Sequence, residues 1–124
     1  MDRQSLFEKA ALGLLAQNRR CVSNGLCLYR DDNGNKCAIG HLIPDNLYSE
    51  DMECGSATSL VKDHEEVANH LGVDDDDDIL FLDTMQTVIH DDLFDSDFKA
   101  GLKKAAAEFA KMYSLKVPNQ LRTK

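Results

Sequence analysis

The dipeptide Asn33-Gly34 is the feature that most constrains how this chain folds. It separates two short apolar segments, 26–29 and 37–43. A type I′ turn requires positive φ at both central residues, and Asn-Gly meets that requirement at low cost. The dipeptide therefore predicts an antiparallel β-hairpin that pairs Asp31 with Lys36, Arg30 with Cys37 and Tyr29 with Ala38. Pro44, which has no backbone N–H, would end the returning strand.

Apolar residues at helical spacing predict helices on both sides of this hairpin. The first helix should begin at Ser5, because Ser5 and Glu8 form an S-x-x-E capping box, and should end near Asn18. A second helix is expected from about Thr58 to Leu71, with Gly72 as the residue that ends it.

Two further helices are expected in the second half of the chain. The run Asp74–Asp78 reads as the acidic start of a helix that continues to about Asp92, because carboxylates are stabilised at a helix N-terminus. Asp95 or Ser96 would cap the last helix, whose apolar positions begin at Phe98. The sequence thus predicts an α+β fold in which about four helices pack on a small antiparallel β-hairpin or three-stranded sheet. Residues 1–115 would form a single globular domain, and 116–124 a loose C-terminal tail.

The charge of the chain is unevenly distributed. The formal net charge is −8 over 124 residues, and the segment 63–97 holds thirteen Asp or Glu with no Lys or Arg. Such a segment disfavours direct binding of nucleic acid, since phosphates would be repelled. We expect no membrane span and a cytoplasmic location, because no apolar run approaches the ~20 residues of a transmembrane helix and the N-terminal residues lack a secretory pattern.

Cysteine and histidine residues raise two chemical possibilities. Cys27, Cys37, His41 and Cys54 are the residues from which a zinc site could be assembled, although no C-x-x-C pair is present. A thiol nucleophile would need Cys37 or Cys54 within reach of His41 or His90. The alternative is that the cysteines are buried apolar residues and that His90 interacts with the end of its helix. We expect no metal and no cofactor.

Four residues of the hairpin region form the most concrete candidate ligand site. Tyr29, Arg30, Lys36 and His41 would bring donors together and could bind a small anion, such as a nucleotide-like molecule. The sequence has no glycine-rich phosphate loop of either common type, and its Asp runs lack the spacing of an EF-hand.

A second candidate site is an acidic face for a partner protein. It is predicted to comprise six carboxylates on the third helix and beside it: Asp74, Asp75, Asp76, Asp77, Asp91 and Asp92. Such a face would suit a basic protein, and it would also aid solubility without any partner.

Two segments of the chain resemble a known group of proteins. The segment 27–53 is similar to part of a family of short uncharacterised proteins encoded by tailed bacteriophages and prophages. The segment 81–115 resembles the C-terminal part of the same family, where a Leu/Met-Gln-x-x-His-Asp motif precedes a last helix ending near Tyr-Gly-Leu. Here Met85, Gln86, His90 and Asp91 match with one residue more between them, and Ser114 replaces the glycine.

The resemblance covers about half of the chain and brings no catalytic residues with it. It implies an accessory protein that acts in a bacterial host, by diverting a host enzyme or blocking a defence system. The leading interpretation is therefore a non-enzymatic protein that binds a host protein. The alternatives are a small-molecule binder that uses the hairpin and, less favoured, a Cys/His enzyme.

Overall fold

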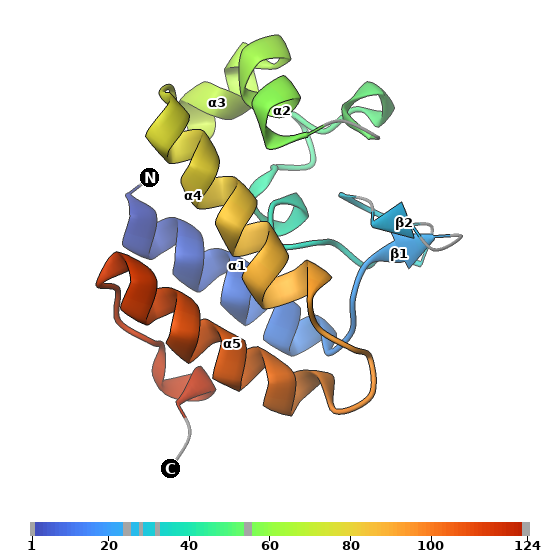
Figure 1. The fold of residues 1–124 in the computed structure, drawn as a ribbon. Coiled ribbons are helices and arrows are strands. Elements are labelled where there is room, and N and C mark those ends of the chain that lie inside the picture. Colours follow the sequence, from blue (N-terminus) through green and yellow to red (C-terminus); the bar gives the residue numbers. More distant parts are fainter. Residues whose placement is uncertain (1, 24–25, 28, 32, 54–55, 123–124) are drawn as a thin grey trace.

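The computed structural model describes residues 2–122 except 24, 25, 28, 32, 54 and 55. Helices dominate it. The longer ones are α1 (Arg3–Gln17), α4 (Asp76–Gln86) and α5 (Phe98–Tyr113), and the short helices α2 (Ala57–Asp63) and α3 (Glu65–Leu71) precede α4. Single turns lie at Gly40–Leu42, Glu50–Met52 and Asn119–Leu121, and the π-helical turn Thr87–Asp91 extends α4. Figure 1 shows α1, α4 and α5 side by side, with α2 and α3 at one end.

The prediction of an α+β fold is wrong. In the described part of the chain, β structure is limited to the two-residue strands β1 (Val22–Ser23) and β2 (Leu26–Cys27) and one isolated bridge between Arg30 and Lys36. Among the residues that the structure describes, no helix packs on a sheet, and the small pairing lies at the margin of the helices (Figure 1). The protein is a helical, bundle-like domain.

The expected hairpin fails at its returning strand. The Arg30–Lys36 bridge differs from the predicted pairing of Arg30 with Cys37. After Cys37 the chain turns into a 3-10 turn, and Ala38, Ile39, Leu42 and Ile43 are all buried. This turn packs against α1. A run that is buried on consecutive residues does not show the alternation of a half-exposed strand, so tertiary burial outweighed the local turn signal.

The cores of the helices follow the predicted apolar spacing. The rings of Phe7, Phe81 and Phe109 join α1, α4 and α5, with centroids 5.5 Å apart for Phe7–Phe109 and 5.3 Å for Phe81–Phe109. The Tyr113 ring meets the Phe81 ring edge-on at 4.9 Å. Met112, on the same helix as Phe109, lies outside this core and is 61% exposed.

The helix ends differ from the predictions in detail. Asp2, not Ser5, caps α1, and its carboxylate accepts a hydrogen bond from the Ser5 N–H at 2.8 Å. Asp97, in the left-handed region at φ 54°, precedes α5 without a side-chain cap. Two predictions are confirmed. Gly72 ends α3 at φ 73°, and the Asp75 carboxylate caps α4 by accepting from the Asp78 N–H at 2.8 Å.

The last described residues are packed, which corrects the expectation of a loose tail for residues 116–122. Leu121 is 1% exposed, and its turn contacts both α1 and α5. Gln4 of α1 holds the backbone of Lys116 at both its polar groups, at 2.8 and 2.9 Å.

Candidate functional site

Charges within the chain already occupy the predicted anion site. Arg30 places its guanidinium 2.9 Å from the Asp45 carboxylate and 4.3 Å over the Tyr48 ring, and it donates to the Ile43 carbonyl at 2.8 Å. The Lys36 ammonium reaches the same Asp45 oxygen at 3.7 Å. Arg30 and Lys36 do converge as predicted, but a carboxylate of the chain lies between them.

Glu53 closes the other side of this region. Its carboxylate accepts from the backbone N–H of Tyr29 at 2.8 Å, from that of Arg30 at 3.3 Å and from the Tyr48 hydroxyl at 3.0 Å. The Tyr29 hydroxyl points elsewhere and donates to the Ser56 carbonyl at 3.4 Å. An external anion would have to displace Glu53 to use these donors.

His41 is separated from that cluster because its imidazole is held against α1. Its Nε2 lies 3.0 Å from the Gln17 Oε1, which also accepts from the Lys36 N–H at 2.7 Å. Gln17 Oε1 is an acceptor, so Nε2 must carry the proton. Burial, followed by the nearby positive charge of Lys36, lowers the pKa of His41 from 6.5 to about 4. The imidazole is therefore neutral at pH 7 and offers no positive charge to an anion.

The described cysteines do not form an activated nucleophile. Cys21 and Cys37 are both buried, and the Cys37 sulfur accepts from the Gly40 N–H at 3.2 Å. Burial raises the pKa of the Cys37 thiol above its ordinary value, which disfavours the reactive thiolate. Of the residues from which a zinc site could be assembled, Cys54 and the side chain of Cys27 lie outside the described residues.

A buried network around His90 was missed by the sequence analysis. His90 is fully buried, and its Nε2 accepts from the Cys21 N–H at 2.9 Å. Its Nδ1 lies 2.8 Å from the Asp91 carboxylate, to which Gln86 also donates at 2.9 Å. Gln86 in turn accepts from the Ile39 N–H at 3.0 Å. This network holds the segments after α1 and before the 3-10 turn against the end of α4.

The predicted acidic face divides into two parts. Asp74, Asp75, Asp76 and Asp77 are exposed at the start of α4. Asp91 belongs to the His90 network. Asp92 follows the π-helical turn that extends α4, about 22 Å from Asp77 at 1.5 Å per residue. Carboxylates of Asp74, Asp75 and Asp78 lie within 4.8 Å of one another. Asp75 and Asp78 serve as a cap and as a partner of Arg3, so this cluster has a structural role.

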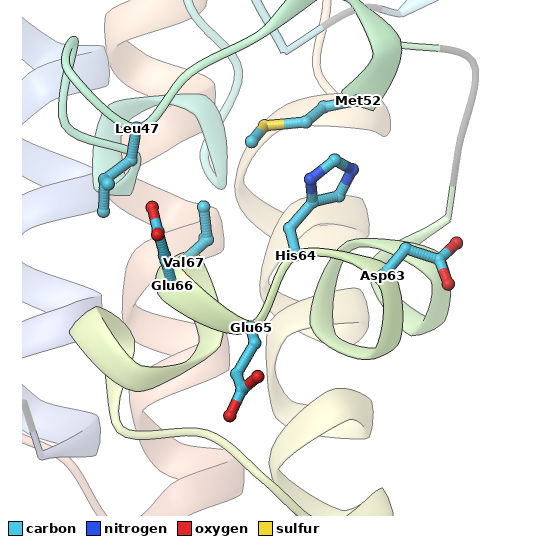
Figure 2. Close-up of a pocket in the computed structure, with 7 residues that line it drawn as sticks. All are labelled: Leu47, Met52, Asp63, His64, Glu65, Glu66 and Val67. Carbon is cyan, nitrogen blue, oxygen red and sulfur yellow. The ribbon is translucent and has the colours of Figure 1, made fainter.

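The junction of α2 and α3 borders a pocket that no sequence signal indicated. It lies where the predicted second helix breaks into α2 and α3 at His64, and its volume is about 310 Å³. Figure 2 shows Leu47, Met52 and Val67 around the space, with the His64 imidazole and the Glu66 carboxylate directed into it. Asp63 and Glu65 also belong to the lining but point away from the centre.

Comparison of the chain with protein-family models, with curated proteins and with solved structures finds no match. Among the described residues, no helix is both long enough and apolar enough to cross a membrane.

Proposed function

We propose that this protein acts by binding a partner protein that presents a basic surface. The binding surface would be formed by the exposed carboxylates of α3 and of the start of α4, which we call the acidic end: Glu65, Glu66, Asp74, Asp75, Asp76 and Asp77. The observation that carries the proposal is that these six side chains are exposed together in a segment, 63–97, without Lys or Arg. Of the carboxylates in this segment, Asp78 and Asp95 pair with Arg3 and Arg20, but no member of the acidic end forms a described ion pair.

Physical chemistry favours a protein partner with clustered Lys or Arg. Concentrated surface charge of one sign speeds the encounter with a surface of opposite charge and repels surfaces of like charge. Such binding weakens as salt is added, because the Debye length falls from about 10 Å at 0.1 M to ~3 Å at 1 M. The same argument gives less support to a nucleotide-like ligand, whose phosphates would be repelled here and would compete with Glu53 and Asp45 at the other candidate site.

A non-catalytic role is proposed on chemical grounds. The Cys37 thiol is buried with a raised pKa, and the His41 imidazole is neutral and bonded to Gln17. The phage-like context remains a prediction from the resemblance. Within that context the basic partner would be a bacterial host protein.

Capture experiments with two variants of equal net charge test the proposal. The first variant, Glu65→Gln with Asp74→Asn, Asp76→Asn and Asp77→Asn, neutralises four of the six carboxylates of the acidic end and leaves Glu66 and the Asp75 cap intact. The control, Glu8→Gln with Glu50→Gln, Asp51→Asn and Glu108→Gln, removes four acidic groups elsewhere. Immobilised wild type should retain basic proteins from a bacterial lysate at 50 mM salt and release them at 500 mM.

The two variants should then differ. We expect the control to retain the same proteins as the wild type and the acidic-end variant to lose them. Equal loss in both variants would show that only net charge matters, and full retention by the acidic-end variant would show that the partner binds elsewhere. Either result contradicts the proposal.

A further inference from the structure

The pocket beside the acidic end combines apolar walls with two polar groups that have no described partner. Its lining joins the segment around Leu47 and Met52 to the α2–α3 junction. Among the described residues, neither the His64 imidazole nor the Glu66 carboxylate forms a hydrogen bond or an ion pair. A volume of about 310 Å³ is at the lower end of the range for small-ligand sites, so it suits one side chain rather than a large cofactor.

The backbone explains why His64 faces this space. His64 ends α2 by donating its N–H to the Leu60 carbonyl at 3.1 Å. It also begins α3, because its carbonyl accepts from the N–H groups of Val67 and Ala68, each at 3.1 Å. The backbone polar groups are therefore satisfied on both sides, at φ −127° and ψ 75°, and the imidazole is left to project between the two helices.

The lining selects the charge and shape of an occupant. Leu47, Met52 and Val67 offer an apolar surface, on which the methylene stem of a long side chain gains burial energy. Glu66 at the mouth supplies a negative charge, and the His64 imidazole places its ring nitrogens beside it. Asp63 and Glu65 add negative charge nearby, so an anionic group would be repelled and a cationic group attracted.

We propose that this pocket receives the side chain of a lysine or arginine from the basic partner. The aliphatic stem would lie against Leu47, Met52 and Val67, and the charged head would lie at Glu66 and His64. The inference rests on the proposed function and adds to it a single anchoring site. An anchor of this kind gives specificity, because diffuse charge alone does not distinguish one basic surface from another.

NMR of methionine methyl groups tests the pocket directly. The chain has four methionines. Met52 lines the pocket, whereas Met85 is fully buried in the core and Met112 is exposed on α5, so they serve as internal controls. The probes are the blocked amino acids N-acetyl-lysine methylamide and N-acetyl-arginine methylamide, with N-acetyl-norleucine methylamide as the uncharged match. Cationic probes should shift the Met52 methyl resonance saturably, and the uncharged probe should bind at least about fivefold more weakly.

Two isosteric variants locate the charge that matters. Glu66→Gln should weaken binding of the cationic probes about tenfold, since it removes the carboxylate at the mouth. Glu50→Gln, on an exposed residue two positions before Met52, removes the same charge outside the pocket and should change the affinity less than twofold. Equal effects of the two variants, or no saturable shift of Met52, would overturn the proposal. Tighter binding of butylamine than of the lysine probe would overturn the assignment to a protein side chain.

The outcomes separate this inference from the proposed function. If the acidic-end variant loses its partners but the probes leave Met52 unchanged, the protein binds basic surfaces without this anchor. If the probes bind at Met52 but the acidic-end variant keeps its partners, the pocket is real and the proposed surface is wrong.

Discussion

At the scale of single residues, Gly13 shows how a helix interior can require glycine for packing. A Cβ at position 13 would lie 2.6 Å from Nδ1 and 2.7 Å from Cγ of His41, closer than real Cβ atoms approach other atoms. The His41 ring is not free to move away, because its Nε2 is hydrogen-bonded to the Gln17 Oε1. The absence of a side chain at Gly13 thus makes room for the imidazole against α1.

We therefore expect Gly13→Ala to destabilise the protein by about 1–3 kcal/mol, because it forces the ring out of its site. The intrinsic preference of helices would give the opposite sign, with alanine better by about 1 kcal/mol. Gly101→Ala on α5 is the matched control, since its Cβ would lie at an ordinary 3.5 Å from Leu93, and it should stabilise slightly. Urea unfolding of both variants measures the difference, and equal stabilisation by both would show that His41 moves freely.

The His41 imidazole also makes the stability depend on pH. Its pKa in the folded state, about 4, lies below its ordinary 6.5, so the unfolded chain binds a proton first as the pH falls. The free energy of unfolding therefore decreases from pH 6.5 to 4. A shift of this size would carry ~3 kcal/mol if fully expressed, and partial contact with water reduces the expected loss to about 1–2 kcal/mol.

The difference between wild type and His41→Gln isolates this contribution from the carboxylates that titrate in the same range. The stability curves of the two proteins against pH should converge as the pH falls from 6.5 to 4, because only the wild type loses the His41 contribution. Parallel curves would show that the imidazole titrates normally in the folded protein.

At the scale of elements, the helices were predictable and their interruptions were not. Apolar spacing located α1, α4 and α5, because each buries one face on its neighbours. The apolar spacing continues without interruption through His64, where the one predicted helix is in fact divided into α2 and α3. The break was not predicted, because apolar spacing does not report the loss of a single backbone hydrogen bond. The Asn33-Gly34 signal is local as well. It does not indicate that the segment from Ala38 to Ile43 packs as a turn against α1.

The candidate sites were also predicted from local sequence signals, which do not show contacts between distant segments. Arg30 and Lys36 were correctly placed near one another, but the sequence does not show that Asp45 and Glu53 fold back to neutralise them. The pocket at His64 joins segments about 12 to 20 residues apart through a helix break, so no spacing rule could have indicated it. The run Asp74–Asp78 was correctly predicted as a helix start, because carboxylates at a helix N-terminus are stabilised locally by the helix itself.

The π-helical turn at the end of α4 sets up the buried His90 network, and π-turns are frequent at functional sites. Here its effect is structural, since the side chains of the consecutive residues Ile89 and His90 are both buried. Nε2 of His90 accepts from a backbone N–H, so the proton must reside on Nδ1 and be donated to Asp91. His41 carries its proton on the other nitrogen, Nε2.

Long-range proton–nitrogen NMR spectra at pH 7 should show these opposite tautomers directly. His90→Ala should destabilise the protein by about 2–4 kcal/mol, because it removes the imidazole to which the buried Cys21 N–H donates and opens a cavity. His70→Ala, at an exposed position of α3, should change the stability by less than ~0.5 kcal/mol. An Nε2–H signal for His90, or equal effects of the two substitutions, would contradict the network as described.

At the scale of the whole molecule, the two ends of the chain hold each other in place. The turn Asn119–Leu121 packs on both α1 and α5, and Gln4 near the start of α1 bonds to the backbone of Lys116. Polar composition suggested a loose tail, because two isolated apolar residues, Val117 and Leu121, give no periodic signal among polar neighbours. Leu121 is 1% exposed, so the described part of the tail belongs to the core.

Leu121→Ala should accordingly destabilise the whole domain by about 2–4 kcal/mol, as for other fully buried leucines. The effect should be global, since the residue contacts the first and the last long helix: urea unfolding followed by circular dichroism and by tyrosine fluorescence should shift to the same lower midpoint. Gln120→Ala, at the exposed neighbouring position, should leave the midpoint within error. Equal midpoints for the two variants would show that Leu121 contributes nothing to the core and that α1 and α5 are stable without the tail.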